Sequence, residues 1–269
     1  MDPWLSTTIF GVVEGLSAFL PISSTGHLLL IDILVGHPAD KSAPYYIIID
    51  LGAFLAVAVM YRKRFASLVA PRPRQRFAGR RGLTLLLLTC LPASVLGIFT
   101  RTAIKDNLFE PLPVALALIA GACMMLIVEG RKKKAWEKYH DLDDISPSLA
   151  LGIGLFQCLS LWPGFSRSAA IILGAMILGS RRRLAVEYSF ISAVPLMIAA
   201  SGYEMWKSWA EFNVADLHFL ALGFVVAFFS AWLAVKWFLA LIDGVTLRPF
   251  AVYRFALAGA MLLSVFWSR

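Results

Sequence analysis

Residues 163–168 read Pro-Gly-Phe-Ser-Arg-Ser and interrupt an apolar run that extends from residue 149 to residue 179. A second break of the same kind, Pro-Ile-Ser-Ser-Thr-Gly-His, occupies residues 21–27 inside the apolar region 5–35. Each half of an interrupted run has about 15 residues, fewer than the roughly 20 that a helix needs to cross a bilayer. Irregular backbone at membrane depth is tolerated only where it lines a cavity or is covered by protein. The breaks therefore predict two re-entrant helical hairpins, 5–35 and 149–179.

The composition of the chain is that of a polytopic membrane protein. Of its 269 residues, 59% are hydrophobic and 16% are charged, and the mean hydropathy is +0.74. These values exclude an ordinary soluble domain. The sequence predicts an all-α fold in a single membrane domain, 1–269, with two re-entrant hairpins and six transmembrane helices. The six predicted spans are 44–61, 83–100, 112–129, 187–206, 217–242 and 250–267.

The basic residues gather in loops that this layout places on one side of the membrane. Loop 62–82 holds eight Lys or Arg residues, loop 130–147 holds five and segment 181–183 adds three, whereas the segments on the opposite side hold five in all. This bias is the positive-inside pattern of cytoplasmic loops. The formal net charge of +8 is therefore attributed to these loops, and no nucleic-acid partner is expected. Both chain ends are expected on the outside.

A hairpin followed by three spans occurs twice, which predicts an internal duplication. Residues 1–130 form repeat 1 and residues 148–269 form repeat 2. An odd number of spans in each unit inverts the second copy, so the hairpins enter from opposite sides and their turns meet near mid-membrane. Inverted repeats with broken helices around a central site are a recurring design of transporters. The segments before the two breaks share a spacing, Gly11-x-x-Glu14-x-x-Ser17 and Gly154-x-x-Gln157-x-x-Ser160.

The polar residues of the two breaks suit a phosphate group. Free N–H groups at the start of a half-helix, with hydroxyls beside them, bind anions. An arginine at membrane depth must face protein, water or an anion. His27 can donate a proton to a leaving oxygen, bind the anion as imidazolium, or serve as a hydrogen-bonded structural residue. The predicted phosphate-binding residues are Ser23, Ser24, Thr25, Gly26, His27, Gly164, Ser166, Arg167 and Ser168.

Two carboxylates lie inside apolar segments, Glu14 in the first hairpin and Asp50 in the span that follows. A carboxylate at this depth is costly unless it binds a metal, a proton or a polar partner. Glu14 and Asp50 are therefore candidate metal ligands. The alternative for Asp50 is a pair with Arg167 that only neutralises the buried charge.

Residues 14–27, Glu-Gly-Leu-Ser-Ala-Phe-Leu-Pro-Ile-Ser-Ser-Thr-Gly-His, and residues 163–168 resemble the two signature motifs of the undecaprenyl-pyrophosphate phosphatase family (BacA/UppP). The likeness extends over essentially the whole chain. It implies a bacterial inner-membrane protein of cell-wall synthesis and bacitracin resistance that acts on a polyprenyl phosphate or pyrophosphate lipid. The enzymes of this family remove one phosphate from undecaprenyl pyrophosphate, usually with a divalent cation such as Mg²⁺ or Ca²⁺, at a site open to the periplasm. A homodimer is a further candidate assembly.

The chain departs from the family's motifs at three positions. Ala18 replaces the second Glu of the motif Glu-x-x-x-Glu, Ile171 replaces a Thr after the second motif, and Asp50 replaces a residue that is usually Gln. One carboxylate and one hydroxyl hold a divalent metal poorly, because Mg²⁺ takes a near-octahedral shell of oxygens. Asp50 supplies a second carboxylate if its span packs against the first hairpin.

These departures favour, as the main hypothesis, a translocase that moves the lipid headgroup across the membrane by alternating access without hydrolysis. The alternative is an active undecaprenyl-pyrophosphate phosphatase that uses Glu14 with Asp50, or Glu14 alone. In that case Ser24, His27 and Arg167 join Glu14 as catalytic residues. The third hypothesis is a binding or regulatory relative, or a transporter of another amphipathic phosphate.

Overall fold

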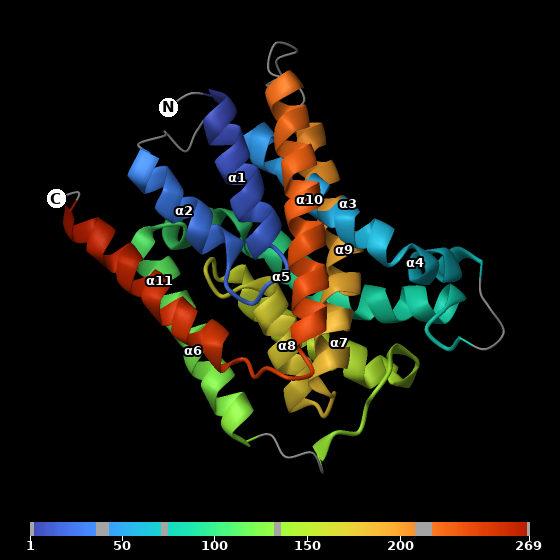
Figure 1. The fold of residues 1–269 in the computed structure, drawn as a ribbon. Coiled ribbons are helices and arrows are strands. Elements are labelled where there is room, and N and C mark those ends of the chain that lie inside the picture. Colours follow the sequence, from blue (N-terminus) through green and yellow to red (C-terminus); the bar gives the residue numbers. More distant parts are fainter. Residues whose placement is uncertain (1–2, 36–42, 71–74, 132–135, 208–216, 268–269) are drawn as a thin grey trace.

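The computed structural model describes residues 3–35, 43–70, 75–131, 136–207 and 217–267, and Figure 1 shows their arrangement. These parts of the chain are helical apart from turns and one isolated bridge between Tyr139 and Ser180. The predicted all-α fold is confirmed. The helices are α1 (Pro3–Ser17), α2 (Ser24–Val35), α3 (Ala43–Met60), α4 (Arg62–Val69), α5 (Gly79–Leu108), α6 (Pro111–Arg131), η3 (Leu142–Asp144), α7 (Pro147–Gln157), η4 (Cys158–Leu161), α8 (Arg167–Ile177), α9 (Arg182–Lys207), α10 (Leu217–Leu241) and α11 (Arg248–Trp267).

Four helices in the described part of the chain are long and apolar enough to cross a membrane, which makes the chain a multi-pass membrane protein. They are Gly79–Leu108, Pro111–Arg131, Arg182–Lys207 and His218–Leu241, and they match four of the six predicted spans. The predicted span 44–61 folds as α3, in which the apolar helix Ile47–Met60 is shorter than these four. The predicted span 250–267 lies in α11.

Both interrupted runs fold as helical hairpins whose turns approach each other (Figure 1). The first hairpin consists of α1 and α2, and the second consists of α7, η4 and α8. Helix α1 packs against α10, and α7 packs against α5, so the first arm of each hairpin packs on a helix from the other half of the chain. The division into repeats 1–130 and 148–269 stays a prediction.

Glycines allow the first arm of each hairpin to approach its supporting helix closely. A Cβ atom on Gly15 of α1 would lie 2.6 Å from the carbonyl oxygen of Ala227 in α10. A Cβ atom on Gly154 of α7 would lie 2.7 Å from the carbonyl oxygen of Thr89 in α5. Both distances are too short for a side chain, so only hydrogen fits there. Small residues at helix contacts are the usual means of close packing inside a membrane.

The basic loops lie together at one end of the molecule. Arg81 donates a hydrogen bond to the carbonyl oxygen of Ile145 at 3.0 Å, and the backbone N–H of Arg181 donates one to the carbonyl oxygen of Tyr139 at 2.9 Å. These contacts join the three basic segments of the sequence, although residues 71–74 and 132–135 lie outside the described part. Helix α4, within the first of these segments, is an element that the apolar pattern did not predict.

Candidate functional site

The turns of the two hairpins meet at a cavity of about 210 Å³. A hydrogen bond of 2.9 Å from the hydroxyl of Ser168 to the carbonyl oxygen of Leu20 joins the two turns beside it. Helices α3 and α9 complete the wall. The residues that line the cavity are Glu14, Ala18, Ser23, Ser24, Thr25, Leu28, Asp50, Phe54, Ser160, Pro163, Gly164, Ser166, Arg167 and Met197. The structure thus brings together most of the residues that the sequence predicts for the site.

A serine in the left-handed region of backbone space precedes the second arm of each hairpin. The φ angle is 72° at Ser23 and 76° at Ser166, and these two are the non-glycine residues with positive φ in the described chain. The hydroxyl of Ser23 accepts the N–H of Gly26, and that of Ser166 accepts the N–H of Ala169, both at 3.3 Å. Each serine therefore caps the helix that follows. Strained backbone of this kind clusters at functional sites.

Helices α2 and α8 both begin at the cavity. Ser24 and Thr25 in the first turn of α2 and Arg167 at the start of α8 belong to its wall. The first N–H groups of a helix have no acceptor within the helix, and the helix dipole adds positive partial charge at this end. Two helix N-termini at one cavity favour an anion with several oxygen acceptors, such as a phosphate.

The side chains of Glu14 and Asp50 interact with each other, and the side chain of Ser24 interacts with Glu14. The Glu14 side chain is only 4% exposed, and its Oε2 has no hydrogen-bond partner among the described residues. Helix α3 thus packs against the first hairpin and places Asp50 beside Glu14, which is the arrangement expected if the two carboxyl groups act together.

Arg167 enters the cavity from the second hairpin. Its guanidinium carbon lies 4.9 Å from the centroid of the Phe54 ring, which is a cation–π contact. Its buried Nε has no hydrogen-bond partner within the described chain. Arg167 interacts electrostatically with Asp50 and with Glu14. The cavity therefore combines a carboxyl wall, from the first hairpin and α3, with the guanidinium of Arg167, which lies against Phe54 of α3.

Three of the predicted phosphate-binding residues lie beside the turns and not on the cavity wall. His27 directs Nδ1 to the carbonyl oxygen of Ser23 at 2.7 Å and Nε2 to the hydroxyl of Tyr253 at 2.6 Å. The hydroxyl of Ser168 donates a hydrogen bond to the carbonyl oxygen of Leu20, and the N–H of Gly26 donates one to the hydroxyl of Ser23. In this structure these residues hold the turns, and their contact with phosphate stays a prediction.

The carboxyl wall suits a hard divalent cation. Glu14, Asp50 and the Ser24 hydroxyl offer only oxygen donors, which Mg²⁺ and Ca²⁺ prefer. The described residues contain no group of three His, Cys, Asp or Glu side chains that could hold a metal. A site with two carboxylates nevertheless fits Mg²⁺, because this ion is usually held by one or two carboxylates together with water and substrate phosphate.

A buried arginine that the sequence analysis left without a function joins both turns. Arg254 of α11 is fully buried, and Gly121 leaves space for it, since a Cβ atom there would lie 2.2 Å from Nη2. All five N–H donors of a guanidinium are used. They donate to the carbonyl oxygens of Pro21 (3.4 Å), Ala117 (3.1 Å), Leu118 (3.1 Å), Gly164 (3.0 Å) and Phe165 (2.8 Å). The signal in the sequence was an arginine inside the predicted span 250–267.

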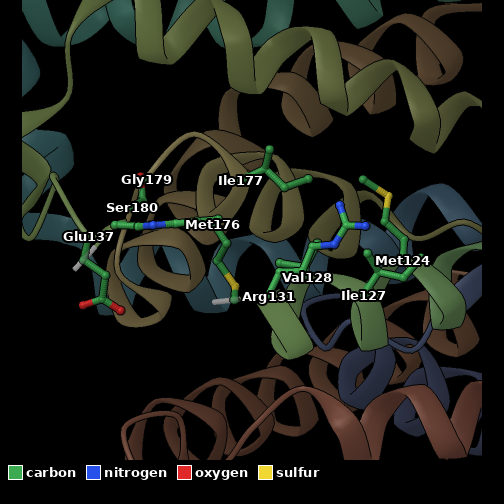
Figure 2. Close-up of a pocket in the computed structure, with 10 residues that line it drawn as sticks. Met124, Ile127, Val128, Arg131, Glu137, Met176, Ile177, Gly179 and Ser180 are labelled. Atoms are coloured by element: carbon green, nitrogen blue, oxygen red, sulfur yellow. The ribbon is translucent and has the colours of Figure 1, made fainter. Parts of the chain in front are cut away.

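A second cavity, of about 300 Å³, lies between α6 and α8 near the basic loops (Figure 2). Its wall is mainly apolar and includes Met124, Val128 and Met176, with Arg131 and Glu137 as its charged members. None of the predicted site residues lines it. The cavity between the hairpin turns is therefore the candidate functional site.

Comparisons with known proteins agree on one family. The family described as "Bacitracin resistance protein BacA" matches residues 7–260. An undecaprenyl-diphosphatase of Nitratidesulfovibrio vulgaris is 57% identical over 258 residues, which are 96% of this chain and 97% of that protein. One of Maridesulfovibrio salexigens is 55% identical over 268 residues, 100% of both chains. The "Undecaprenyl-diphosphatase 1" of Bacillus anthracis is 41% identical over 266 residues, 99% of both. The resemblance carried by the two turn motifs is confirmed, and the chain belongs to the BacA family.

Proposed function

We propose that the chain hydrolyses undecaprenyl pyrophosphate to undecaprenyl phosphate and inorganic phosphate. The observation that carries this proposal is the pair of interacting carboxyl groups of Glu14 and Asp50 on the wall of the cavity that Arg167 also lines. The sequence favoured a translocase because Ala18 removes one carboxylate of the family's motif. Asp50 supplies that carboxylate from another helix, and the relatives are named as phosphatases. Both points favour the phosphatase over the translocase.

In the proposed reaction, a water oxygen attacks the terminal phosphorus of the pyrophosphate. The bond between this phosphorus and the bridging oxygen breaks, and its electron pair leaves with undecaprenyl phosphate. The pair of Glu14 and Asp50 takes the proton from the water. Arg167, with Ser166 and the N-termini of α2 and α8, stabilises the negative charge on the phosphate oxygens. The cavity thus holds charges of both signs, which orient the substrate with its phosphates at Arg167 and the water at the carboxyl groups.

Glu14, Asp50 and Ser24 would hold the divalent cation that the family's activity implies. Mg²⁺ or Ca²⁺ bound there supplies positive charge that neutralises the pyrophosphate. The buried Oε2 of Glu14 has no hydrogen-bond partner among the described residues, so it is free to coordinate this cation.

The proposed substrate also implies where the chain is located. The substrate requires a membrane that holds undecaprenyl lipids, which is the bacterial inner membrane. The clustered basic loops are assigned to the cytoplasmic side by the positive-inside rule, with both chain ends outside. A homodimer stays a prediction.

The test is phosphate release from undecaprenyl pyrophosphate by the purified protein, with Mg²⁺, with Ca²⁺ and with a chelator. We expect Glu14→Gln and Asp50→Asn each to slow turnover by about 10²–10⁴-fold, the range for loss of a general base. The double variant should lose little more than the worse single variant, because the two groups act as one unit. Asp106→Asn, at an exposed position near the end of α5, is the matched control.

Two outcomes would contradict the proposal. One is a wild-type protein that binds the lipid but releases no phosphate, which would return the translocase to first place and require a flipping assay in liposomes. The other is a double variant with wild-type turnover, which would move the chemistry away from the carboxyl pair.

A further inference from the structure

The imidazole of His27 is held between the turn of the first hairpin and α11. Its Nδ1 lies 2.7 Å from the carbonyl oxygen of Ser23, and its Nε2 lies 2.6 Å from the hydroxyl of Tyr253. The His27 and Tyr253 rings are stacked, with an angle of 14° between their planes and 5.5 Å between their centroids. Both ring nitrogens of His27 are thus engaged away from the cavity wall.

The hydrogen-bond network assigns the proton positions of the His27 ring. A carbonyl oxygen can only accept, so Nδ1 carries the proton that is donated to Ser23. In the neutral ring Nε2 is then an acceptor, and the hydroxyl of Tyr253 must donate to it. Tyr253 therefore selects the orientation of the ring as well as its tautomer.

The hydrogen bond from the His27 ring stabilises the strained backbone at Ser23, where the backbone hydrogen bond of the helix is weak. Ser23 has a φ of 72°, and its carbonyl oxygen lies 3.4 Å from the backbone nitrogen of His27. In the second hairpin the matching bond, from Ala170 to Ser166, is 3.0 Å long, and Ala170 has no side-chain donor. In the first turn the backbone hydrogen bond is thus longer, and the Nδ1 atom of the His27 ring makes a second hydrogen bond of 2.7 Å to the same carbonyl oxygen.

We propose that Tyr253 is a positioning residue for the headgroup site. Its hydroxyl fixes the His27 ring, the ring holds the Ser23 carbonyl, and this keeps Ser23 and Ser24 turned toward the cavity that they line. Tyr253 itself does not line that cavity. It is 45% exposed and lines a separate apolar groove between α10, α11 and the first turn. Its effect on the site is therefore exerted through His27.

The first test is ¹⁵N NMR of the full chain, labelled at its four histidines, in lipid nanodiscs. His27→Gln identifies the His27 signals by their loss. In the wild-type protein we expect Nδ1 to be protonated and Nε2 to be a hydrogen-bonded acceptor. In Tyr253→Phe, which keeps the stacked ring, the Nε2 signal should shift toward that of an unbonded nitrogen. Tyr203→Phe, an exposed tyrosine near the end of α9, should leave it unchanged.

The second test measures turnover and rests on the proposed function. Tyr253→Phe should lower kcat about tenfold, the loss that corresponds to one hydrogen bond, with little change in KM. Because Tyr253 acts through His27, Tyr253→Phe should cause no further loss in a His27→Gln background. Tyr203→Phe should again match the wild type.

The outcomes separate the inference from the proposed function. A wild-type His27 that carries its proton on Nε2 overturns the inference, whether or not Tyr253→Phe can be purified. Losses that multiply in the double variant also overturn it, because Tyr253 would then act independently of His27. Absence of phosphate release by the wild-type protein refutes the proposed hydrolysis and leaves the NMR result standing.

Discussion

The two hairpins have the same turn geometry and carry different chemistry. A left-handed serine caps the second arm in both, Ser23 in the first hairpin and Ser166 in the second. Nine residues earlier stands Glu14 in the first hairpin and Gln157 in the second. The side chain of Glu14 interacts with that of Asp50 and lines the cavity. Gln157 is 1% exposed, and neither atom of its amide has a partner among the described residues.

The difference shows which features belong to the scaffold and which belong to the reaction. The capped, left-handed turn and the glycine contact of the first arm occur in both hairpins, so they serve to bring a helix N-terminus to the cavity. The charges are divided between the hairpins, with the carboxylate on α1 and the guanidinium of Arg167 on α8. A site made from two similar hairpins can therefore present opposite charges to one substrate.

The largest effect is expected from Arg254, which donates hydrogen bonds to the turns of both hairpins. Arg254→Met removes the donor to the turn carbonyl groups of Pro21, Gly164 and Phe165, and each buried carbonyl left without a donor costs about 1–3 kcal/mol. The total of about 3–9 kcal/mol is comparable to the whole stability of a typical domain, so we expect little or no folded protein. Arg254→Lys offers three donors and should fold with a lower melting temperature. Size-exclusion chromatography and thermal unfolding in detergent measure both. A wild-type melting temperature for Arg254→Met would show that the two turns stand without this link.

The glycine contacts test whether the two hairpins are held equally firmly, α1 against α10 and α7 against α5. Gly15→Ala and Gly154→Ala place a Cβ against backbone at 2.6 and 2.7 Å, so each should lower the free energy of unfolding by about 1–3 kcal/mol. Gly259→Ala meets no heavy atom within 4 Å and is the control. SDS-induced unfolding gives the three values. Destabilisation by only one of the first two variants would mean that the other hairpin can move on its support.

Gln157 tests the chemical difference between the hairpins. An amide buried without partners is destabilising, so Gln157→Met, which has a similar size and no polar group, should be neutral or stabilise the fold by about 1 kcal/mol. The matched change Glu14→Met should instead abolish phosphate release. Unfolding midpoints and turnover of both variants decide the matter. A destabilised Gln157→Met would reveal a buried water bound to the amide.

The smallest effect is expected at the foot of the second hairpin. Asp144 accepts the backbone N–H groups of His140 at 2.9 Å and Asp141 at 3.0 Å, and these bonds lower the pKa of Asp144. A carboxyl group whose pKa falls on folding stabilises the protein above its unfolded pKa, near 4, and this contribution is lost as the pH falls through the folded value. Asp144→Asn should therefore lower the melting temperature slightly at pH 7, and the difference should vanish in acid. A difference that persists at pH 2 would contradict this account.

The hairpins were predictable because a polar break with a proline leaves two apolar arms that are each too short to cross the bilayer. The cavity residues of the two turns followed from the same breaks, since helix N-termini with hydroxyls beside them suit anions. The same two motifs also carry the resemblance to the BacA family, so the family was predictable from residues 14–27 and 163–168 alone.

Contacts between distant helices were beyond this reasoning. Ala18 indicated that Glu14 lacks a second carboxylate on its own helix, and neighbours on one helix are all that the sequence pattern shows. In the structure Asp50 supplies a carboxylate beside Glu14 from α3. For the same reason the translocase was favoured over the phosphatase. The partner of His27 on α11 and the five acceptors of Arg254 likewise depend on tertiary packing. Only the rarity of an intramembrane arginine pointed to Arg254.

The link made by Arg254 also bears on biosynthesis. The arginine is separated from Pro21 by 233 positions and from Gly164 by 90, so both turns are made long before their shared donor. Until α11 has been inserted, the carbonyl groups of both turns lack this partner at membrane depth. The polypeptide therefore completes the link between its two turns only after α11 has been made, and an unfinished chain lacks the donor that joins them.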